Sequence, residues 1–527
     1  MQSRIGSWQL ALVSLGSVIG SGWLFSPFYG LQAAGGAVLL AWLLAALLSL
    51  LICLTFARMC KAFPLVGGTY RLLGITHPGS TSRLFLIVGW LSFVVLLPLE
   101  AQSVVQYLGF WFPRLLHHAP GGEVDLSWSG LAVAVVVGLC VTWFNTLHIS
   151  RVAQANALVS VWKLLIPLLL ALVVIIGFGS MEQFGRYWNR GMLDFEPAMQ
   201  AVVGSGLVFA FTGFQNGLML ANQARDPQRA VPYSLYLPLL LGLLLYLLLS
   251  ISYMASMPGE GRELASAAAP LLGLLSVLGL SLLTPVLLAD AVVSPLGTAN
   301  AYVAASGRIL YAFGYEVRPG SLLTRLNRHG SPALALWVNA AVGLLFLLPF
   351  PTWKQLVSLM SSMMVFTFAS APVSLGALAA MRRPAGELPA RLSPTSGLRA
   401  QCVGVAGFLG CTWMVYWSGA HNLALLWATL ALAMVAHGWL EARFAGIRDA
   451  LRENLHMLML VAGLWLLAWL RQRDLLAFPW DNVLAAAAGL AAYAVFVGAR
   501  LEAAQIDRNV DRADSERRGD AMRAAAT

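Results

Sequence analysis

The chain has 527 residues, of which 59% are hydrophobic and only 11% are charged, and its mean hydropathy is +0.75. This composition excludes a soluble domain built around one core and indicates an integral membrane protein. The net charge is +10, and the basic residues are placed in the loops as the positive-inside rule expects for a membrane protein. We therefore expect no nucleic-acid partner. The five cysteines show neither a disulfide framework nor a metal-ligand spacing, and no metal or other cofactor is expected.

Hydropathy predicts an all-α protein with about fourteen membrane-spanning helices, since one crossing takes roughly 20 apolar residues. The expected spans are 8–30, 34–57, 84–108, 128–147, 153–177, 198–220, 232–256, 272–305, 332–350, 355–380, 399–418, 421–440, 454–470 and 482–499. Lysine and arginine are concentrated on the side of the N-terminus, as at Arg58, Lys61, Arg71 and Arg83. The positive-inside rule therefore places both termini in the cytoplasm and the chain in the cytoplasmic membrane.

The first span contains S-L-G-S-V-I-G-S-G-W-L-F-S-P over residues 14–27. A helix with this glycine- and serine-rich centre, followed by Pro27, is expected to be broken. Unpaired backbone groups at this depth are tolerated where they line a cavity or meet a ligand, which favours a binding site. Close helix packing through small residues is the alternative.

A second break is expected in the sixth span, where G-S-G at 204–206 precedes F-A-F-T-G-F-Q-N-G at 209–217. The first and sixth spans each begin a group of five membrane-spanning helices. Because five is an odd number, the second group enters the membrane from the face opposite to the first. Paired broken helices at equivalent positions indicate an inverted-repeat transporter with a site near the midplane. The predicted parts are a first repeat (1–177), a second, inverted repeat (178–381), accessory helices (382–500) and a solvated cytoplasmic tail (501–527).

Together the two breaks predict a site for a zwitterion. The N–H groups at the start of a half-helix suit a carboxylate, and carbonyls released at the breaks suit an ammonium group or a cation. Aromatic side chains of the sixth span would close over such a ligand, with ordinary packing as the alternative. The expected substrate-binding residues are Val18, Ile19, Gly20, Ser21, Gly22, Trp23, Phe209, Phe211, Thr212, Gly213 and Gln215.

Ionisable residues inside the spans form a second set of candidates. Lys163 is the only lysine or arginine deep in a span, and a central lysine costs on the order of +3 kcal/mol, so we expect it to carry a proton or to occupy a cation site. A structural ion pair is the alternative. Asp290 is followed at one-turn intervals by Ser294 and Thr298. The hydroxyl groups of these two residues could bind a sodium ion or form a hydrogen bond with Lys163. Glu100 completes the predicted proton-coupling set, with a structural role as its alternative if it lies near the outer interface.

Five segments resemble the amino acid–polyamine–organocation permease superfamily in composition and order. They are G-S-V-I-G-S-G-W-L-F (16–25), F-P-L-V-G-G-T-Y (63–70), F-A-F-T-G-F-Q (209–215), R-D-P-Q-R-A-V-P (225–232) and A-A-S-G-R-I-L-Y-A-F (304–313). The resemblance covers roughly residues 8–380. Trp23 and D-A-V-V-S-P-L-G-T at 290–298 are most similar to bacterial permeases grouped with the aspartate:proton symporters.

This resemblance implies a LeuT-like fold of five plus five helices, with broken helices 1 and 6 and alternating access. It places the carboxylate of an amino acid on the backbone of residues 20–23 and its amino group against the sixth-span break. Lys163 falls where proton-coupled members carry a lysine in place of a sodium site. Many members have glutamate where this chain has Gln215 and Gln223, which argues against a mechanism using an acid there.

The predicted function is secondary active import of an amino acid, most simply by proton symport, with Lys163 as the first coupling residue and Asp290 as the second. The expected partners are the amino acid, protons and the lipid bilayer. An exchanger with Lys163 as a fixed charge is the neighbouring alternative. A membrane-embedded transferase would need clustered acids, bases or nucleophiles, whereas the eight histidines are scattered over short loops, so we do not expect an enzyme.

Overall fold

The computed structural model describes residues 6–63, 71–118, 124–147, 149–189, 191–221, 224–257, 268–317, 321–381, 395–440 and 444–512. Gln223, residues 64–70 of the second-span motif and the tail beyond residue 512 lie outside these ranges. Within the ranges the chain is almost entirely helical. One short antiparallel hairpin is the only sheet in the described part, with His117 opposite Asp125.

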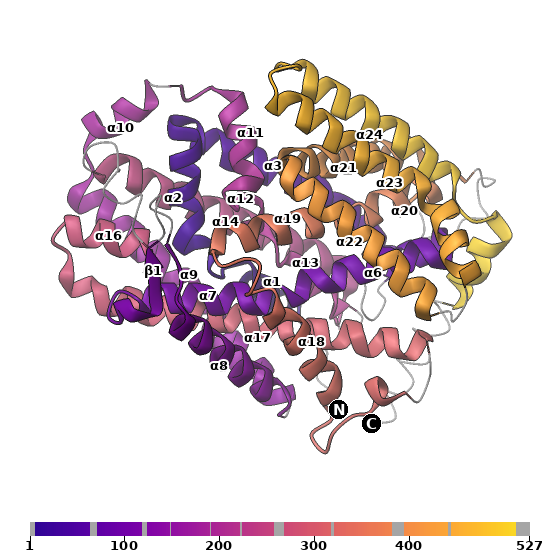
Figure 1. The fold of residues 1–527 in the computed structure, drawn as a ribbon, viewed down its shortest axis with the longest axis horizontal. Helices are drawn as coiled ribbons and strands as arrows, with labels where there is room; N and C mark the ends of the chain where they lie inside the picture. Colours follow the sequence, from indigo (N-terminus) through magenta and orange to yellow (C-terminus); the bar gives the residue numbers. More distant parts are fainter. Residues whose placement is uncertain are drawn as a thin grey trace.

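Figure 1 shows the arrangement of the helices and strands. In chain order they are α1 (Ser7–Val18), α2 (Gly22–Ala34), η1 (Gly35–Ala37), α3 (Val38–Ala62), α5 (Leu73–Thr76), α6 (Gly79–Val94), α7 (Leu96–Leu108), η2 (Pro113–Leu115), β1 (Leu116–His118), β2 (Val124–Leu126), α8 (Trp128–Asn145), α9 (Ile149–Phe178), α10 (Met181–Trp188), α11 (Phe195–Gly204), α12 (Leu207–Phe211), α13 (Phe214–Leu218), α14 (Pro227–Ser256), α16 (Pro270–Val277), η4 (Ser281–Leu283), α17 (Thr284–Val317), η5 (Leu322–Thr324), α18 (Ala333–Leu345), α19 (Trp353–Phe368), α20 (Ser370–Ala379), α21 (Gly397–Trp417), α22 (Gly419–Leu440), α23 (Phe444–Gln472) and α24 (Trp480–Gly498).

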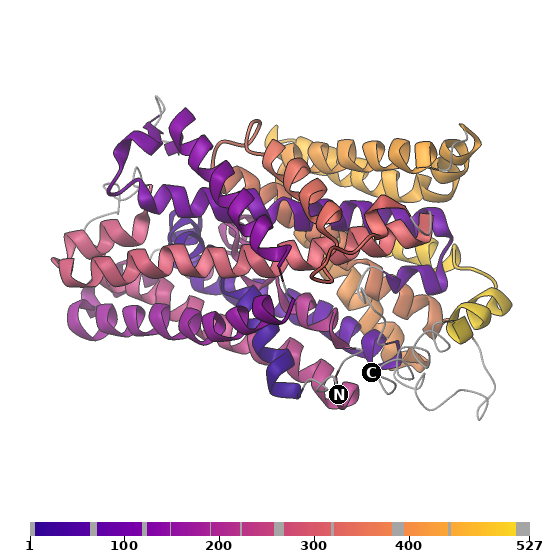
Figure 2. The ribbon, with the colours of Figure 1, turned by 90° about the horizontal axis from the view of Figure 1, so that it is seen from below.

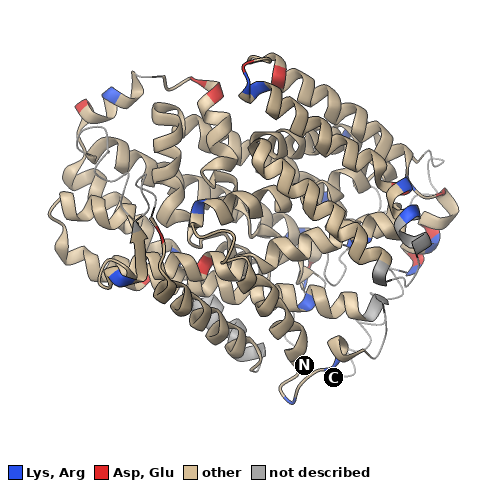
Figure 3. Ribbon diagram, viewed as in Figure 1, with Lys and Arg blue, Asp and Glu red and all other residues tan. Residues whose placement is uncertain are grey.

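Most of these helices are long and apolar enough to cross a bilayer. Among the described residues there are eleven such helices, or twelve when the bent pair Phe195–Gly204 and Leu207–Leu218 is taken as one span. α1 and α18 are shorter, and α2 with α3 forms one segment of 41 residues, so the total of fourteen spans stays a prediction. Figure 3 shows that charged residues lie mainly near helix ends and in loops, as expected for helices surrounded by hydrocarbon.

Both glycine-rich segments interrupt a helix in the structure. α1 ends at Val18 and α2 begins at Gly22, so residues 19–21 belong to neither helix. In the sixth span, α11 and the following helical segment are bent by 63°. Gly206 precedes α12 with φ +74°, and Gly213 precedes α13 with φ +115°. Glycine reaches these left-handed conformations without steric cost, which explains why the helix is interrupted at these positions.

The R-D-P sequence after the sixth span explains where α14 begins. Asp226 is the N-cap residue, and its carboxylate accepts a hydrogen bond from the N–H of Gln228 at 3.0 Å. Pro227 follows at the first helical position, where no backbone N–H is needed. The R-D-P sequence therefore starts α14, a helix of 30 residues that packs along α1 and α3.

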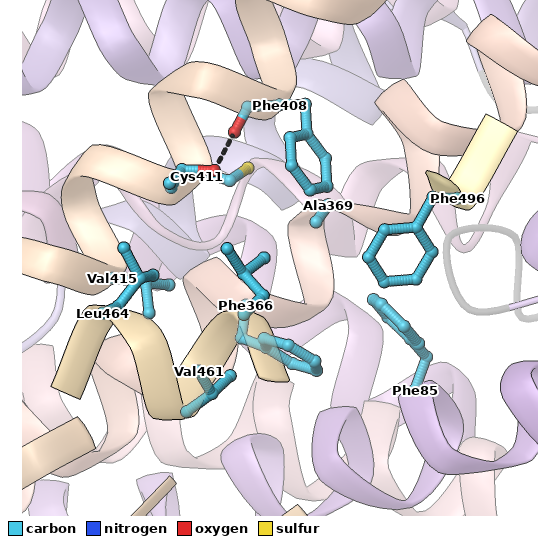
Figure 4. Close-up of a pocket in the computed structure, with 11 residues that line it drawn as sticks. Phe85, Phe366, Ala369, Phe408, Cys411, Val415, Val461, Leu464 and Phe496 are labelled. Carbon is cyan, nitrogen blue, oxygen red and sulfur yellow. Dashed lines mark hydrogen bonds between the residues drawn. The ribbon is translucent and has the colours of Figure 1, made fainter. Parts of the chain in front are cut away.

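Helices α21 to α24 form a group on one side of the other helices, drawn in orange to yellow in Figure 1. α21 packs on α3 and α20, whereas α22 and α23 pack on each other and on α6. A small apolar cavity lies between this group and α6 and α19, and Figure 4 shows Phe85, Phe366 and Phe408 among the side chains that line it. In the described part of the chain, the residues of this cavity include none of the predicted site residues.

A buried ionic network joins three accessory helices to α11. Asp481, at the start of α24, is fully buried and accepts hydrogen bonds from Tyr416 on α21 and from Arg471 on α23, each at 2.8 Å. Arg471 also pairs with Glu196 in the first turn of α11 at 2.5 Å. A buried charge is tolerated only when it is paired, so Asp481 requires Arg471, and the second bond of Arg471 reaches α11 at the partly exposed Glu196.

Replacing Arg471 by leucine is expected to lower the free energy of unfolding by about 3 kcal/mol, because it leaves the Asp481 carboxylate buried without a cation. Thermal unfolding of the purified protein in detergent measures this effect as a lower melting temperature. Arg186→Leu is the matched control, since Arg186 pairs with Glu182 on the surface of α10 and surface pairs contribute roughly 0–1 kcal/mol. Equal shifts for the two variants would contradict the role of the network.

The C-terminal segment differs from the fully solvated tail expected from its mixed charges. Residues 503–512 are helical. Ile506 and Val510 lie one turn apart on this helix, and both are buried. The charged residues around them are exposed where they are described, so the helix buries only a narrow apolar side that the charge pattern does not reveal.

This C-terminal helix and the residues before it are bonded to α5, in the connection between α3 and α6. The N–H of Leu501 donates to the carbonyl of Thr76 at 2.8 Å. The side-chain amide of Asn509 donates to two carbonyls of α5 at 3.2 and 3.3 Å. Nε2 of His77 lies 2.9 Å from the carbonyl oxygen of Phe496, at the end of α24. Residues 496–509 thus complete the packing of residues 74–77.

Candidate substrate and coupling site

The backbone between α1 and α2 is the centre of the candidate site. Ile19 is extended, with φ −89° and ψ +90°, and its carbonyl and that of Gly16 accept hydrogen bonds from side chains of other helices. Gly20 has no room for a side chain, because a Cβ would lie 2.6 Å from Oε1 of Glu100 and 3.0 Å from Thr298. The predicted break is therefore packed closely against charged and hydroxyl groups.

Lys163 on α9 contacts this break directly. Its buried Nζ donates to the carbonyl of Gly16 at 2.8 Å and to Oγ1 of Thr298 at 2.6 Å. Oγ1 of Thr298 lies 3.1 Å from the carbonyl oxygen of Ile19. Gly297 leaves space for the lysine, since a Cβ there would approach Cε of Lys163 to 2.9 Å. Figure 2 shows the long helix α17 with α9 running alongside it, which brings these residues together.

Two further predicted residues extend the same face of α17. Oγ of Ser294 donates to the carbonyl of Ile19 at 3.4 Å. Asp290 lies one turn earlier and is fully buried, and neither of its carboxylate oxygens has a hydrogen-bond partner among the described residues. Its charge interacts with that of Lys163. The polar face of α17 is thus turned towards α9 and the first break.

Glu100 on α7 also lies at the first break. It is fully buried, and its Oε2 accepts a hydrogen bond from the N–H of Ser21 at 3.0 Å. Its Oε1 has no partner in the described part of the chain. One of the N–H groups expected to hold the substrate carboxylate is therefore bonded to a carboxylate of the protein itself.

The break in the sixth span touches the first break through backbone atoms. A Cβ on Gly213 would lie 2.5 Å from the carbonyl carbon of Ser17 and 2.7 Å from the backbone nitrogen of Val18. The N–H of Gly213 donates to Oε1 of Gln215 at 2.9 Å, and Nε2 of Gln215 lies 3.4 Å from Sδ of Met364. The side chain of Gln215 thus stabilises the broken backbone of its own span. Its amide is neutral, so it does so without placing a charge at the break.

Several carbonyls expected to face an ammonium group are bonded within the protein. The carbonyl of Phe209 accepts hydrogen bonds from the N–H and the hydroxyl of Thr212, at 2.8 and 2.7 Å. The hydroxyl of Tyr246 donates to the carbonyl of Ala210 at 2.9 Å and lies 3.3 Å from that of Val18. Tyr246 is absent from the predicted set, because it is one of four tyrosines in an apolar helix and no sequence signal separates it from residues that only pack.

Aromatic residues cover the site on the side of α19. Nε1 of Trp353, a second residue that the sequence did not single out, donates to Oγ of Ser21 at 2.9 Å. The ring of Phe209 meets that of Trp353 edge-on, with centroids 6.0 Å apart. Phe211 instead packs edge-on against aromatic rings of α3 and α14. Phe209 is therefore placed beside the break, whereas Phe211 contributes to packing between helices.

Gly22 and Trp23 begin α2, at the positive end of its helix dipole. A Cβ on Gly22 would lie 3.2 Å from both Cα and Cβ of Ala210, so the first and sixth spans are in close contact here as well. Trp23 is buried, and its Nε1 has no partner among the described residues. The N–H groups of these two residues stay the predicted groups for binding a carboxylate.

Comparison with known proteins agrees with the resemblance seen in the sequence. The model of the amino acid permease family matches residues 5–437. The chain belongs to this family. The permease is 27% identical over 514 residues to the glutamate/serine transporter AimA of Bacillus subtilis, covering 94% of this chain and 93% of that protein. It is 26% identical over 440 residues to the aspartate-proton symporter of the same organism, covering 81% of each chain.

A more distant relative has a different substrate in its name. The permease is 24% identical over 379 residues to the branched-chain amino acid permease BcaP of Lactococcus lactis, covering 68% of this chain and 77% of that protein. Its relatives are thus named for acidic, hydroxyl and branched-chain amino acids. The permease is a multi-pass membrane protein of an amino acid transport family, and the choice of side chain varies within that family.

Proposed function

We propose that the permease imports amino acids across the cytoplasmic membrane by proton-coupled symport and alternating access. The observation that carries this proposal is the position of Lys163, whose Nζ bonds to the carbonyl of Gly16 and the hydroxyl of Thr298. Carbonyl and hydroxyl oxygens are ligands that also suit a sodium ion, and broken helices supply such ligands in transporters. Here an ammonium group holds them, which favours the proton as the driving ion.

The proton on Lys163 gives a physical link between protonation and the position of the first break. The charged amine is a strong donor towards both oxygens, and charge-assisted bonds are roughly twice as strong as neutral ones. Loss of the proton weakens both bonds and loosens α1 from α9 and α17. Proton binding and release at Lys163 would therefore shift the equilibrium between two arrangements of these helices.

We infer the repeat organisation and the orientation from the same features. Residues 1–177 and 178–381 would be the two inverted repeats, with 382–500 as accessory helices and both termini in the cytoplasm. The interrupted helices at the start of each block, their backbone contact at Gly213 and the excess of basic residues on one side support this organisation. The site then lies near the midplane, between the two repeats.

The substrate is proposed to bind with its carboxylate at the N–H groups of residues 21–23. Glu100 already bonds to the N–H of Ser21, so the substrate must displace it, and two carboxylates held this close repel each other when both are charged. Uptake of a proton by Glu100 removes that repulsion. The names of the relatives make aspartate, glutamate and serine the first substrates to test.

Glu100→Gln is expected to remove most of the pH dependence of substrate binding. In the wild type, affinity should rise as the pH falls, by up to about tenfold per pH unit if one proton is taken up with the substrate. Glutamine keeps an acceptor for the N–H of Ser21 but has no charge to neutralise. Titration calorimetry from pH 5.5 to 8 measures the slope, with Glu182→Gln on the exposed surface of α10 as the matched control. If affinity changed with pH as steeply in Glu100→Gln as in the wild type, Glu100 would not compete with the substrate carboxylate for the N–H of Ser21.

Transport by the purified protein in liposomes tests the proposed function itself. With the outside acidic and the lumen alkaline, labelled aspartate, glutamate or serine should accumulate above equilibrium. A protonophore should abolish the accumulation, and replacing sodium by choline should not change it. Exchange of internal for external amino acid without net uptake would favour the exchanger, in which Lys163 is only a fixed charge. Accumulation that requires sodium would overturn the proton coupling.

A further inference from the structure

The polar face of α17 contains one buried carboxylate whose role the substrate site does not explain. Asp290, Ser294 and Thr298 follow one another at one-turn intervals, so they lie in a row along one side of the helix. Thr298 and Ser294 both bond to the first break. Asp290 reaches no backbone group of that break, and both of its oxygens lack a hydrogen-bond partner among the described residues.

A charged group in this position needs a reason to be there. A carboxylate with no exposed surface and no cation within hydrogen-bond distance is costly within a bilayer, where such residues mark ion or proton pathways. Two groups on α9 act on Asp290: Lys163 through its charge, and the indole of Trp162 as a weak hydrogen-bond donor to the carboxylate. The neighbouring segment of α16 and η4, residues 270–283, contains no titratable side chain. Among the residues that the structure describes, Asp290 therefore interacts with one ionisable neighbour, Lys163.

The position of Asp290 along α17 places it between the outer face and Lys163. With the proposed orientation, α17 begins at the outer face at Thr284, and Asp290 follows about 9 Å along the helix axis at 1.5 Å per residue. Thr298, which binds Lys163, lies about 12 Å further along the same axis. The row of side chains thus leads from the outer part of the helix to the amine.

We propose that Asp290 is the group through which Lys163 exchanges protons with the outside, and that the hydroxyls of Ser294 and Thr298 complete the path. This inference rests on the proposed proton symport. An external hydronium ion protonates the Asp290 carboxylate and leaves as water. Each hydroxyl then accepts a proton on its oxygen and gives up its own, until the neutral amine of Lys163 becomes ammonium and Asp290 is a carboxylate again. Water molecules bridge any gap between these groups.

Asp290→Asn tests this path, because the amide fills the same space but cannot carry the proton. Accumulation of substrate under a pH gradient should fall by about a hundredfold or more, as expected when a positioned proton-transfer group is removed. Acidification of the lumen, measured with an enclosed pH dye, should be lost with it. Counterflow of labelled against unlabelled substrate needs no net proton transfer and should persist. Ser294→Ala should slow lumen acidification less, since water can replace a hydroxyl.

The controls separate this inference from the proposed function. Glu182→Gln makes the same chemical change on the exposed surface of α10 and should accumulate substrate as the wild type does. Asp290→Glu should restore part of the acidification if a carboxyl group at this position is what matters. Wild-type acidification in Asp290→Asn, or loss of counterflow together with accumulation in a variant that elutes as a folded monodisperse protein, would overturn the inference. If the wild type itself does not acidify the lumen, the proposed symport fails instead.

Discussion

Lys163→Gln is expected to abolish accumulation of substrate under a pH gradient while the protein remains folded. Glutamine cannot carry a proton, and its amide replaces two charge-assisted bonds, to Gly16 and Thr298, by weaker neutral ones. Uptake into liposomes with an imposed pH gradient measures the loss, and size-exclusion chromatography shows whether the fold is kept. Lys61→Gln, in the last turn of α3, is the matched control and should transport normally. Unchanged accumulation by Lys163→Gln would contradict the assignment.

Lys163→Arg separates symport from exchange with a fixed charge. Arginine keeps its proton in proteins, so it preserves the cation but cannot release it. If Lys163 carries the transported proton, the arginine variant should lose net uptake. If Lys163 only replaces sodium as a permanent cation, the arginine variant should retain exchange and uptake in the same ratio as the wild type. Parallel counterflow and gradient-driven assays distinguish the two outcomes.

Gly213→Ala is expected to prevent transport and to destabilise the fold. Gly213 has φ +115°, and the added Cβ would lie 2.5 Å from the carbonyl carbon of Ser17, an atom of the backbone that cannot rotate away. The backbone conformation alone costs roughly 1–2 kcal/mol in a residue with a side chain, and the clash with the first span adds to it. Thermal unfolding and uptake into liposomes measure the two effects.

Gly204→Ala is the matched control for this change, because it lies in the same span. A Cβ on Gly204 has no other atom within 4 Å, and its φ is not positive. We expect this variant to transport normally and to unfold at the same or a higher temperature, since alanine favours the helix by about 1 kcal/mol over glycine. If Gly213→Ala behaved like Gly204→Ala, the close contact between the two breaks would not matter for transport.

The two interruptions could be predicted because glycine acts locally. Glycine at positions 206 and 213 permits a left-handed backbone that other residues avoid, and this property does not depend on the rest of the fold. A lysine within an apolar span is costly, so its need for polar partners follows from its position in the sequence alone. The one-turn spacing of Ser294 and Thr298 then placed both hydroxyls on one face of their helix.

The contact of Glu100 with the first break and the roles of Trp353 and Tyr246 could not be predicted in this way. Hydropathy places a residue within a span but does not fix the rotation of the helix, which is decided by side-chain packing. The bond from Glu100 to the N–H of Ser21 depends on that rotation. Trp353 and Tyr246 are each one of several aromatic residues in an apolar helix, and only the folded structure shows that they bond to the breaks.

The contact between α5 and residues 496–509 also determines when this part of the permease can finish folding during synthesis. His77 is synthesised 419 residues before Phe496, whose carbonyl lies beside its ring. At roughly 5–20 residues per second, the ribosome needs about 20–80 s to supply that partner. During this interval the connection between α3 and α6 lacks the bonds made by Leu501 and Asn509. The packing around α5 is therefore completed only after the ribosome has made α24 and the helix at residues 503–512.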